Sequence, residues 1–349
     1  MATAAEAGAR FSKRLEAVRE RPAALGDGPL GSALSEGFLA GIEERVNGEP
    51  TNWATWPPLF VHAARSTSGQ LQALDAAMKA VTAQTRPERR AGTDGWLLAQ
   101  EGGEGVRRWR SGLFELAVKS RFLAAATDVE FDAVLRNGRD VDVRATVAGR
   151  PMCFDATVIT ESDEDQAVWT RFMAAKAADE TAVLVRPGDH DSDDANGPSP
   201  YYDTIRVCLK LYDKLAKAFD PAKSQLSEDE PNVITLSVWT GHGIPYTSSP
   251  GIRWALDELF ADQPNAGAVK EMTRPGLADV SLRHFLDKVA PQRAMELLQS
   301  PRRASAVGLF NETAYGKGRI NYNASPAHQL SHPEMAAIEA ITRLPLPWG

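Results

Sequence analysis

Hydrophobic and polar positions recur with a helical period through the N-terminal part of the chain. Apolar side chains three and four residues apart predict helices at 10–19 and 70–82, with a weaker helical pattern at 30–46. Two stretches that contain Pro, within 47–58, interrupt this period. The pattern therefore predicts a helical region over residues 1–105.

The period changes from helical to alternating in the middle of the chain. A helix over 107–126 leads into three short β-rich runs at 129–135, 141–147 and 151–159. Short turn sequences that contain Gly separate the three runs, as expected for hairpin connections. This order predicts a helix followed by a three-stranded meander, with 141–147 and 151–159 paired as an antiparallel hairpin packed on the helix.

The rest of the chain mixes helical and extended patterns. The apolar, β-branched run at 232–240 predicts a buried strand. Further strands are predicted at 304–310 and 319–322, and further helices at 166–180, 202–219, 252–260 and 282–298.

These elements define an α/β protein with a mixed central sheet flanked by helices. We expect three segments: a helical N-terminal region (1–105), an α/β core (106–243) and a C-terminal α/β extension (244–349) that adds strands to the sheet.

Composition narrows the class of protein. The 349 residues are 43% hydrophobic and 24% charged, which supports a packed core and excludes wholesale disorder. Two cysteines are too few for a disulfide framework. No apolar run approaches the ~20 residues of a membrane span, and the N-terminus has no apolar signal region, so we expect a cytoplasmic protein. A net charge of −7 argues against a surface that grips nucleic acid everywhere, and leaves room for a local basic cleft.

Three carboxylates mark the helix and meander as the chemically informative part. Glu115 lies on the predicted helix, Asp142 near the start of one strand, and Asp155 near the middle of the next. Joined by a short turn, the two aspartates would be cross-strand neighbours. Two carboxylates at that range repel each other unless they share a divalent cation.

This stretch resembles the PD-(D/E)xK nuclease superfamily, whose core is an acidic helix followed by a β-meander. Asp142 matches the first Asp of the motif, preceded by Val141 rather than Pro, and Glu115 matches the carboxylate on the helix. The second motif element is matched by 155–157, in which Thr157 stands where the family has Lys. The resemblance covers residues 106–240 and implies a sheet of restriction-endonuclease-like type.

The resemblance also implies a reaction and a metal site. Asp142, Asp155 and the carbonyl of Ala156 would hold Mg²⁺ or Mn²⁺, which polarises the phosphate and lowers the pKa of the attacking water. The implied activity is hydrolysis of phosphodiester bonds. The implied partner is nucleic acid, DNA rather than RNA, in a bacterial defence against foreign DNA. The oligomeric state stays open.

The hydroxyl of Thr157 cannot supply the positive charge that orients the attacking water. Lys119, one helical turn from Glu115, and Lys223 are candidate substitutes. The missing motif lysine also favours a second hypothesis, in which the protein is a catalytically inactive module that keeps the nuclease fold and binds nucleic acid or a partner protein. No motif supports a third, a small-molecule enzyme on an unrelated α/β fold.

Each of these residues also has a purely structural interpretation. Glu115 and Lys119 would then form only an ion pair on the helix surface. The two motif aspartates would be ordinary acids on a strand surface. The basic run 107–110 either contacts phosphate while Trp109 stacks on a base, or is a solvated helical turn.

Outside this stretch, the motifs favour structural roles. His328 and His332 have the i,i+4 spacing of a metal-binding helix face, but without a zinc-protease glutamate between them they are expected to be two surface histidines. Cys153, flanked by apolar residues, is expected to be a core thiol.

Overall fold

The structure is a computed structural model. It describes residues 4–48, 57–89, 102–159, 223–238, 300–309, 319–324 and 326–346, together with Leu211, Lys214, Leu215, Phe260 and Trp348. The helices predicted at 166–180, 252–260 and 282–298 lie outside the described residues, apart from Phe260. Of the helix predicted at 202–219, the three described residues are helical.

The N-terminal region is a layered group of helices, as predicted. The pattern at 30–46 forms two helices rather than one, because α3 ends before Leu34 and α4 begins at Glu36. A proline expected to interrupt helical structure instead begins α5 at Pro58, since a proline in the first turn has no hydrogen bond to lose. The helices are α1 (Ala4–Arg19), α2 (Arg21–Leu25), α3 (Pro29–Ala33), α4 (Glu36–Gly48), α5 (Pro58–Arg65), α6 (Ser68–Gln84) and the 3₁₀ turn η2 (Pro87–Arg89).

Asp75 on α6 anchors the start of α3. Its carboxylate accepts the backbone N–H of Leu30 at 2.9 Å and pairs with Lys79 at 2.9 Å. Gly28 precedes α3 at this contact, and a Cβ there would stand 2.0 Å from the Asp75 carboxylate. A buried acid thus caps a helix from a neighbouring helix, and glycine leaves the room for it.

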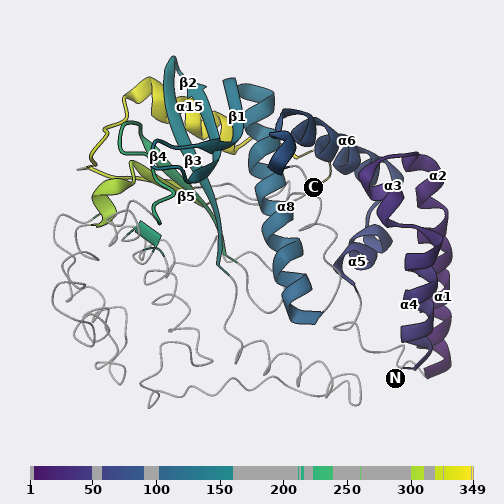
Figure 1. The fold of residues 1–349 in the computed structure, drawn as a ribbon. Helices are drawn as coiled ribbons and strands as arrows, with labels where there is room; N and C mark the ends of the chain where they lie inside the picture. The colour runs from purple at the N-terminus through teal and green to yellow at the C-terminus, as the bar shows by residue number, and fades with distance from the viewer. Residues whose placement is uncertain are drawn as a thin grey trace, which may run out of the picture.

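A long helix and a six-stranded sheet form the second half of the fold (Figure 1). Helix α8 (Gly102–Ala125) lies between the N-terminal helices and the sheet and packs against the first three strands. The strands are β1 (Thr127–Val134), β2 (Asp140–Val147), β3 (Arg150–Ile159), β4 (Asn232–Val238), β5 (Ala306–Leu309) and β6 (Arg319–Tyr322), and they lie side by side in chain order.

The predicted meander is confirmed. β1, β2 and β3 pair antiparallel, and the β2–β3 hairpin packs on α8. The turn residues Ala148 and Gly149 have φ of 51° and 85°, and positive φ at both central positions is the two-residue geometry that matches the right-handed twist of a hairpin.

The remaining strands make the sheet mixed. β4 runs parallel to β3, β5 parallel to β4, and β6 antiparallel to β5. The strands predicted at 304–310 and 319–322 are therefore present and extend the sheet, which confirms an α/β fold with a mixed sheet. At the opposite end, Thr85 forms a parallel bridge with Phe131, and Arg86 pairs with Glu130 of β1. The boundaries of the three segments stay a prediction.

Helix α15 (His332–Thr342) was not predicted. It begins with a capping box in which Ser331 and Glu334 satisfy each other's backbone N–H groups. His332 is exposed at the start of this helix, while His328 precedes it and places Nε2 2.7 Å from the Glu228 carbonyl oxygen. The two histidines therefore share no helix face.

One hydrophobic core joins the helices to the sheet. Phe122 of α8 packs on Phe154 of β3 with ring centroids 4.1 Å apart. Trp109 is only 6% exposed and lies against His62, so the hypothesis that its indole stacks on a base is wrong. Cys153 is buried, as expected. No helix among the described residues is long and apolar enough to cross a membrane.

Candidate active site

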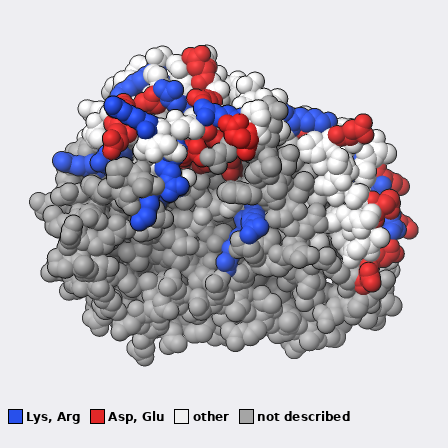
Figure 2. Space-filling view, viewed as in Figure 1, with Lys and Arg blue, Asp and Glu red and all other residues white. Residues whose placement is uncertain are grey.

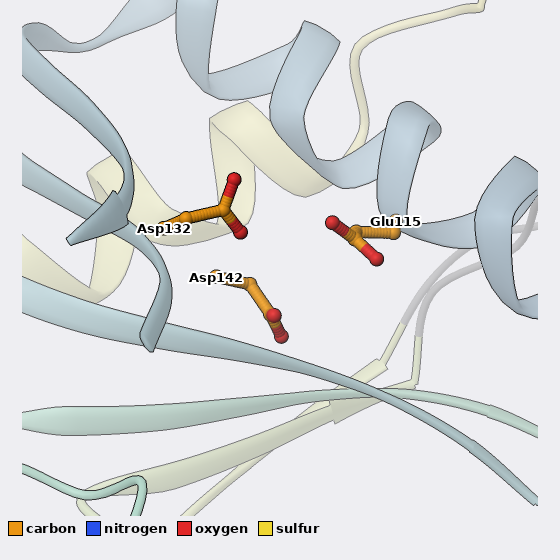
Figure 3. A group of neighbouring side chains, drawn as sticks. All are labelled: Glu115, Asp132 and Asp142. Carbon is orange, nitrogen blue, oxygen red and sulfur yellow. The ribbon is translucent and has the colours of Figure 1, made fainter. Parts of the chain in front are cut away.

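Three carboxylates from three elements converge beside α8. Glu115 lies on α8, Asp132 on β1 and Asp142 on β2, and one oxygen of each lies within 4.8 Å of the others. Figure 3 shows the three side chains close together, with Glu115 on the helix facing Asp132 and Asp142 beside them on the next strand. Oxygen atoms at this spacing suit a hard divalent cation such as Mg²⁺ or Mn²⁺.

Strand register explains how the carboxylates meet. Phe131 pairs with Val143 and Ala133 with Val141, so Asp132 lies across from Asp142. On the other side, Val143 pairs with Phe154. Continuing that register by one residue brings Asp155 opposite Asp142, and the three aspartates form a row across β1, β2 and β3.

Asp132 was missed by sequence reasoning. Its φ of 49° is left-handed, a conformation that Asp tolerates better than most residues and that interrupts a regular strand. Its neighbours Phe131 and Ala133 are both fully buried. An acidic residue within a predicted strand was the available signal, but alternation gave no direction for its side chain.

The environment of Asp142 disfavours a negative charge. Its Oδ2 accepts the backbone N–H of Ala156 at 2.5 Å. Removal from water, and then the negative charges of Asp155 and Glu115, raise the pKa of Asp142 well above its usual value, against the opposing pull of two lysines. Burial and the neighbouring acids therefore oppose ionisation of Asp142.

Asp155 lies beside this cluster and has its own cation. Its side chain is 2% exposed, and its Oδ2 pairs with Lys214 Nζ at 2.6 Å. Thr157 donates its hydroxyl to the same oxygen at 2.9 Å. Thr235 of β4 donates to the Asp155 backbone carbonyl at 3.1 Å, which ties the strand to its parallel neighbour. Thr157 thus supports Asp155 from the motif position, and the positive charge comes from elsewhere.

Lys119 bridges two of the other carboxylates, Glu115 and Asp132. Its Nζ lies 2.6 Å from Glu115 and 3.0 Å from both oxygens of Asp132, and its side chain is fully buried. Burial, the largest single influence, lowers the pKa of Lys119, yet the charges of Glu115 and Asp132 outweigh it and the pKa is raised. The ammonium is therefore held charged. It does not form only a surface pair with Glu115, because it also crosses to β1.

Lys214, and not either proposed substitute, is the lysine at Asp155. Its side chain is 21% exposed. Burial, the largest single influence, lowers the pKa of Lys214, but the charge and hydrogen bond of Asp155 and the charge of Asp142 together outweigh it and the pKa is raised. Lys223 is exposed before the loop into β4. The contact joins residues far apart in the sequence, so no local spacing pointed to Lys214.

The structure thus groups the predicted residues differently from the motif-based expectation. Glu115 and Asp142 share a potential metal site with Asp132, while Asp155 lies near enough for its charge to act on Asp142. Ala156 contributes its N–H to Asp142.

Comparison with known proteins adds no relative. No family model matches the chain, and no curated protein or solved structure matches it either. The chemistry of this site has to follow from its own residues.

A second polar cluster lies on the sheet away from these acids. Arg144 donates Nε to Glu230 at 2.9 Å, and the Cys153 thiol lies 3.3 Å from the same carboxylate. The hydrogen bond from Arg144 is the main cause that lowers the pKa of Glu230. Burial, followed by the Glu230 carboxylate, raises the pKa of the Cys153 thiol, so this cysteine is unreactive.

Proposed function

We propose that this protein is a metal-dependent nuclease that hydrolyses phosphodiester bonds. The observation that carries the proposal is the convergence of Glu115, Asp132 and Asp142 within 4.8 Å, next to an aspartate that pairs with a partly exposed lysine. Carboxylates that could hold a divalent cation, with a separate ammonium group close by, are the components that phosphodiester hydrolysis needs.

The order of elements supports a restriction-endonuclease-like sheet. The acidic helix α8 comes first and is followed by the antiparallel meander β1–β3. Strand β4 comes next and runs parallel to β3. The resemblance to the PD-(D/E)xK superfamily implies such a core. The match lies in topology and in the positions of Glu115, Asp142 and Asp155.

Each residue then has a role in the proposed site. Glu115, Asp132 and Asp142 would hold Mg²⁺ or Mn²⁺, which supplies Lewis-acid activation of the phosphate and of water. Lys214, held by Asp155, would stabilise charge that develops on the attacking water and the phosphate. Lys119 cannot do this, because it is fully buried and engaged by two carboxylates.

Nucleic acid, with DNA favoured over RNA, is the proposed partner. Figure 2 shows acidic and basic side chains intermingled on the described part of the visible face, without a continuous basic surface over the sheet. With a net charge of −7, the protein would bind the backbone through the metal and a few local cations rather than through a broad field. A role in defence against foreign DNA stays a prediction.

A cleavage assay tests the proposal. Single- and double-stranded DNA and RNA are incubated with wild type and with Asp142→Ala, in Mg²⁺, in Mn²⁺ and in EDTA. We expect metal-dependent cleavage by wild type and none by Asp142→Ala. Glu36→Ala is the matched control, since it removes an exposed carboxylate on α4 that is not part of the cluster. Cleavage that persists in Asp142→Ala would overturn the assignment of the site.

A catalytically inactive nuclease-fold module is the second candidate. The observation that favours it is the internal neutralisation of the acids, since Lys119 pairs with Glu115 and Asp132 and Lys214 pairs with Asp155. Tight binding of nucleic acid by wild type, without cleavage in either metal, would select this function. Thr157→Lys then tests whether a cation at the motif position restores activity.

A further inference from the structure

Lys119 places a positive charge where the proposed metal would bind. Its ammonium is in hydrogen-bond contact with two of the three carboxylates of the cluster, Glu115 and Asp132. A divalent cation at these carboxylates would therefore share oxygens with an ammonium group that is already present.

The ammonium group cannot move away into water. The Lys119 side chain has no exposed surface, and Nζ lies 5.6 Å from the centre of the Phe131 ring. A surface lysine can leave a carboxylate by changing rotamer, as the half-exposed Lys79 can leave Asp75. Lys119 instead stays near the site and opposes any second cation by direct repulsion.

The charges of the whole site show what this lysine changes. Glu115, Asp132, Asp142 and Asp155 provide four carboxylates, and Lys119 and Lys214 provide two ammonium groups, for a formal charge of −2. One divalent ion balances that charge, so an arriving phosphodiester meets a neutral site. Without Lys119 the charge is −3, and a metal-loaded site would repel a phosphate.

We propose that Lys119 is an internal counter-cation that lowers the affinity of the site for the divalent ion and raises the affinity of the metal-loaded site for phosphodiester. The inference rests on the proposed function, because it concerns the same metal site. Lys119 is a positioning residue here, since it reaches the substrate only through the charge that it sets on the carboxylates.

The test compares metal and nucleic-acid affinity in one set of variants. Mn²⁺ binding is measured by titration calorimetry for wild type, Lys119→Met and the control Lys79→Met. Binding of a hydrolysis-resistant phosphorothioate oligonucleotide is measured at saturating Mn²⁺. We expect Lys119→Met to bind Mn²⁺ at least ~10-fold more tightly and the oligonucleotide at least several-fold more weakly, with Lys79→Met unchanged in both.

The opposite signs separate this proposal from a purely structural role. A lysine that only holds the carboxylates in place would, when removed, weaken both affinities together. Equal or weaker Mn²⁺ binding by Lys119→Met, or Mn²⁺ binding by neither protein, overturns the proposal.

A second variant covers loss of folding. If Lys119→Met does not fold in EDTA, the comparison is made with Lys119→Gln, whose amide can donate to a carboxylate without adding charge, and the same outcomes decide. Failure of the proposed function would appear as no cleavage by wild type, while the ratio of Mn²⁺ affinities would still be measurable.

Discussion

Two i,i+4 acid–lysine pairs, one on α6 and one on α8, show how differently the two halves of the molecule use charge. Asp75 and Lys79 lie 2.9 Å apart, and Glu115 and Lys119 lie 2.6 Å apart. Lys79 is 52% exposed, whereas Lys119 has no exposed surface. The sequence spacing is the same, and the surroundings decide what each pair does.

The carboxylates differ in the same way. Asp75 pairs with Lys79 and caps α3 through the Leu30 N–H, so its burial is compensated by its partners. Burial, followed by the charges of Asp155 and Glu115, raises the pKa of Asp142. Structural acids are paired one to one, while the acids of the proposed site are crowded together, an arrangement that favours a bound cation.

The largest effect that should separate the two regions is on cleavage. Lys214→Met should lower the rate by roughly 10²–10³-fold, because it removes a charge that stabilises the transition state. Lys79→Met should leave the rate unchanged. The measurement is single-turnover cleavage at saturating metal. A Lys214→Met protein as active as wild type would show that the ammonium at Asp155 has no part in the reaction.

Acid should weaken the helical region through His62. Burial lowers its pKa to about 4, and its Nε2 has no hydrogen-bond partner among the described residues. The folded state then binds fewer protons than the unfolded state below pH 6.5, so stability falls as the pH drops from 6.5 to about 4, by up to about 3 kcal/mol. His62→Phe should remove this dependence in urea unfolding measured across that range. An unchanged pH dependence would place the acid-sensitive group elsewhere.

Asp75→Ala should destabilise the fold by about 1–3 kcal/mol. The change leaves the Leu30 N–H without its acceptor and removes the cap of α3. Urea unfolding at neutral pH measures the effect, with exposed Glu36→Ala as a control of the same charge change. Equal stability of both variants would mean that water replaces the carboxylate at α3 without cost.

The smallest expected effect has the opposite sign. The pKa of Asp142 is raised in the folded state, so above the ordinary carboxyl pKa of 3.8 the folded state binds more protons than the unfolded state. The free energy of unfolding therefore decreases as the pH rises through the folded pKa. Asp142→Asn keeps an acceptor for the Ala156 N–H and should therefore raise the melting temperature at neutral pH in EDTA. A lower melting temperature than wild type would show that the charged form stabilises the fold.

The fold was largely predictable from local pattern. Alternation and turn residues located β2 and β3 to within a residue, because a half-buried hairpin needs both signals. Helix α15 was missed although Ser331 and Glu334 form a capping box, a signal that is present in the sequence. Pro58 was misinterpreted because a proline that breaks a helix and a proline that begins one look alike without the next turn of the chain.

The site was predictable only where the residues share a local motif. Glu115, Asp142 and Asp155 were selected because helix and hairpin are contiguous in sequence. Asp132 required knowledge of a left-handed backbone residue, and Lys214 required a long-range contact. Neither feature produces a periodic pattern in the sequence. Hydrophobic periodicity indicates which face of an element is buried, but it does not indicate which residues a charged side chain contacts.

The bridge between Thr85 and Phe131 bears on how the protein behaves at high concentration. β1 is an end strand of the sheet, and an open end strand offers unpaired N–H and C=O groups to any other extended chain. The segment after α6 covers part of that edge through the bridge and through the pair of Arg86 with Glu130. Detachment of this short segment would expose the edge of β1 to strand addition by another chain. The segment that follows α6 therefore also protects the sheet from edge-to-edge aggregation.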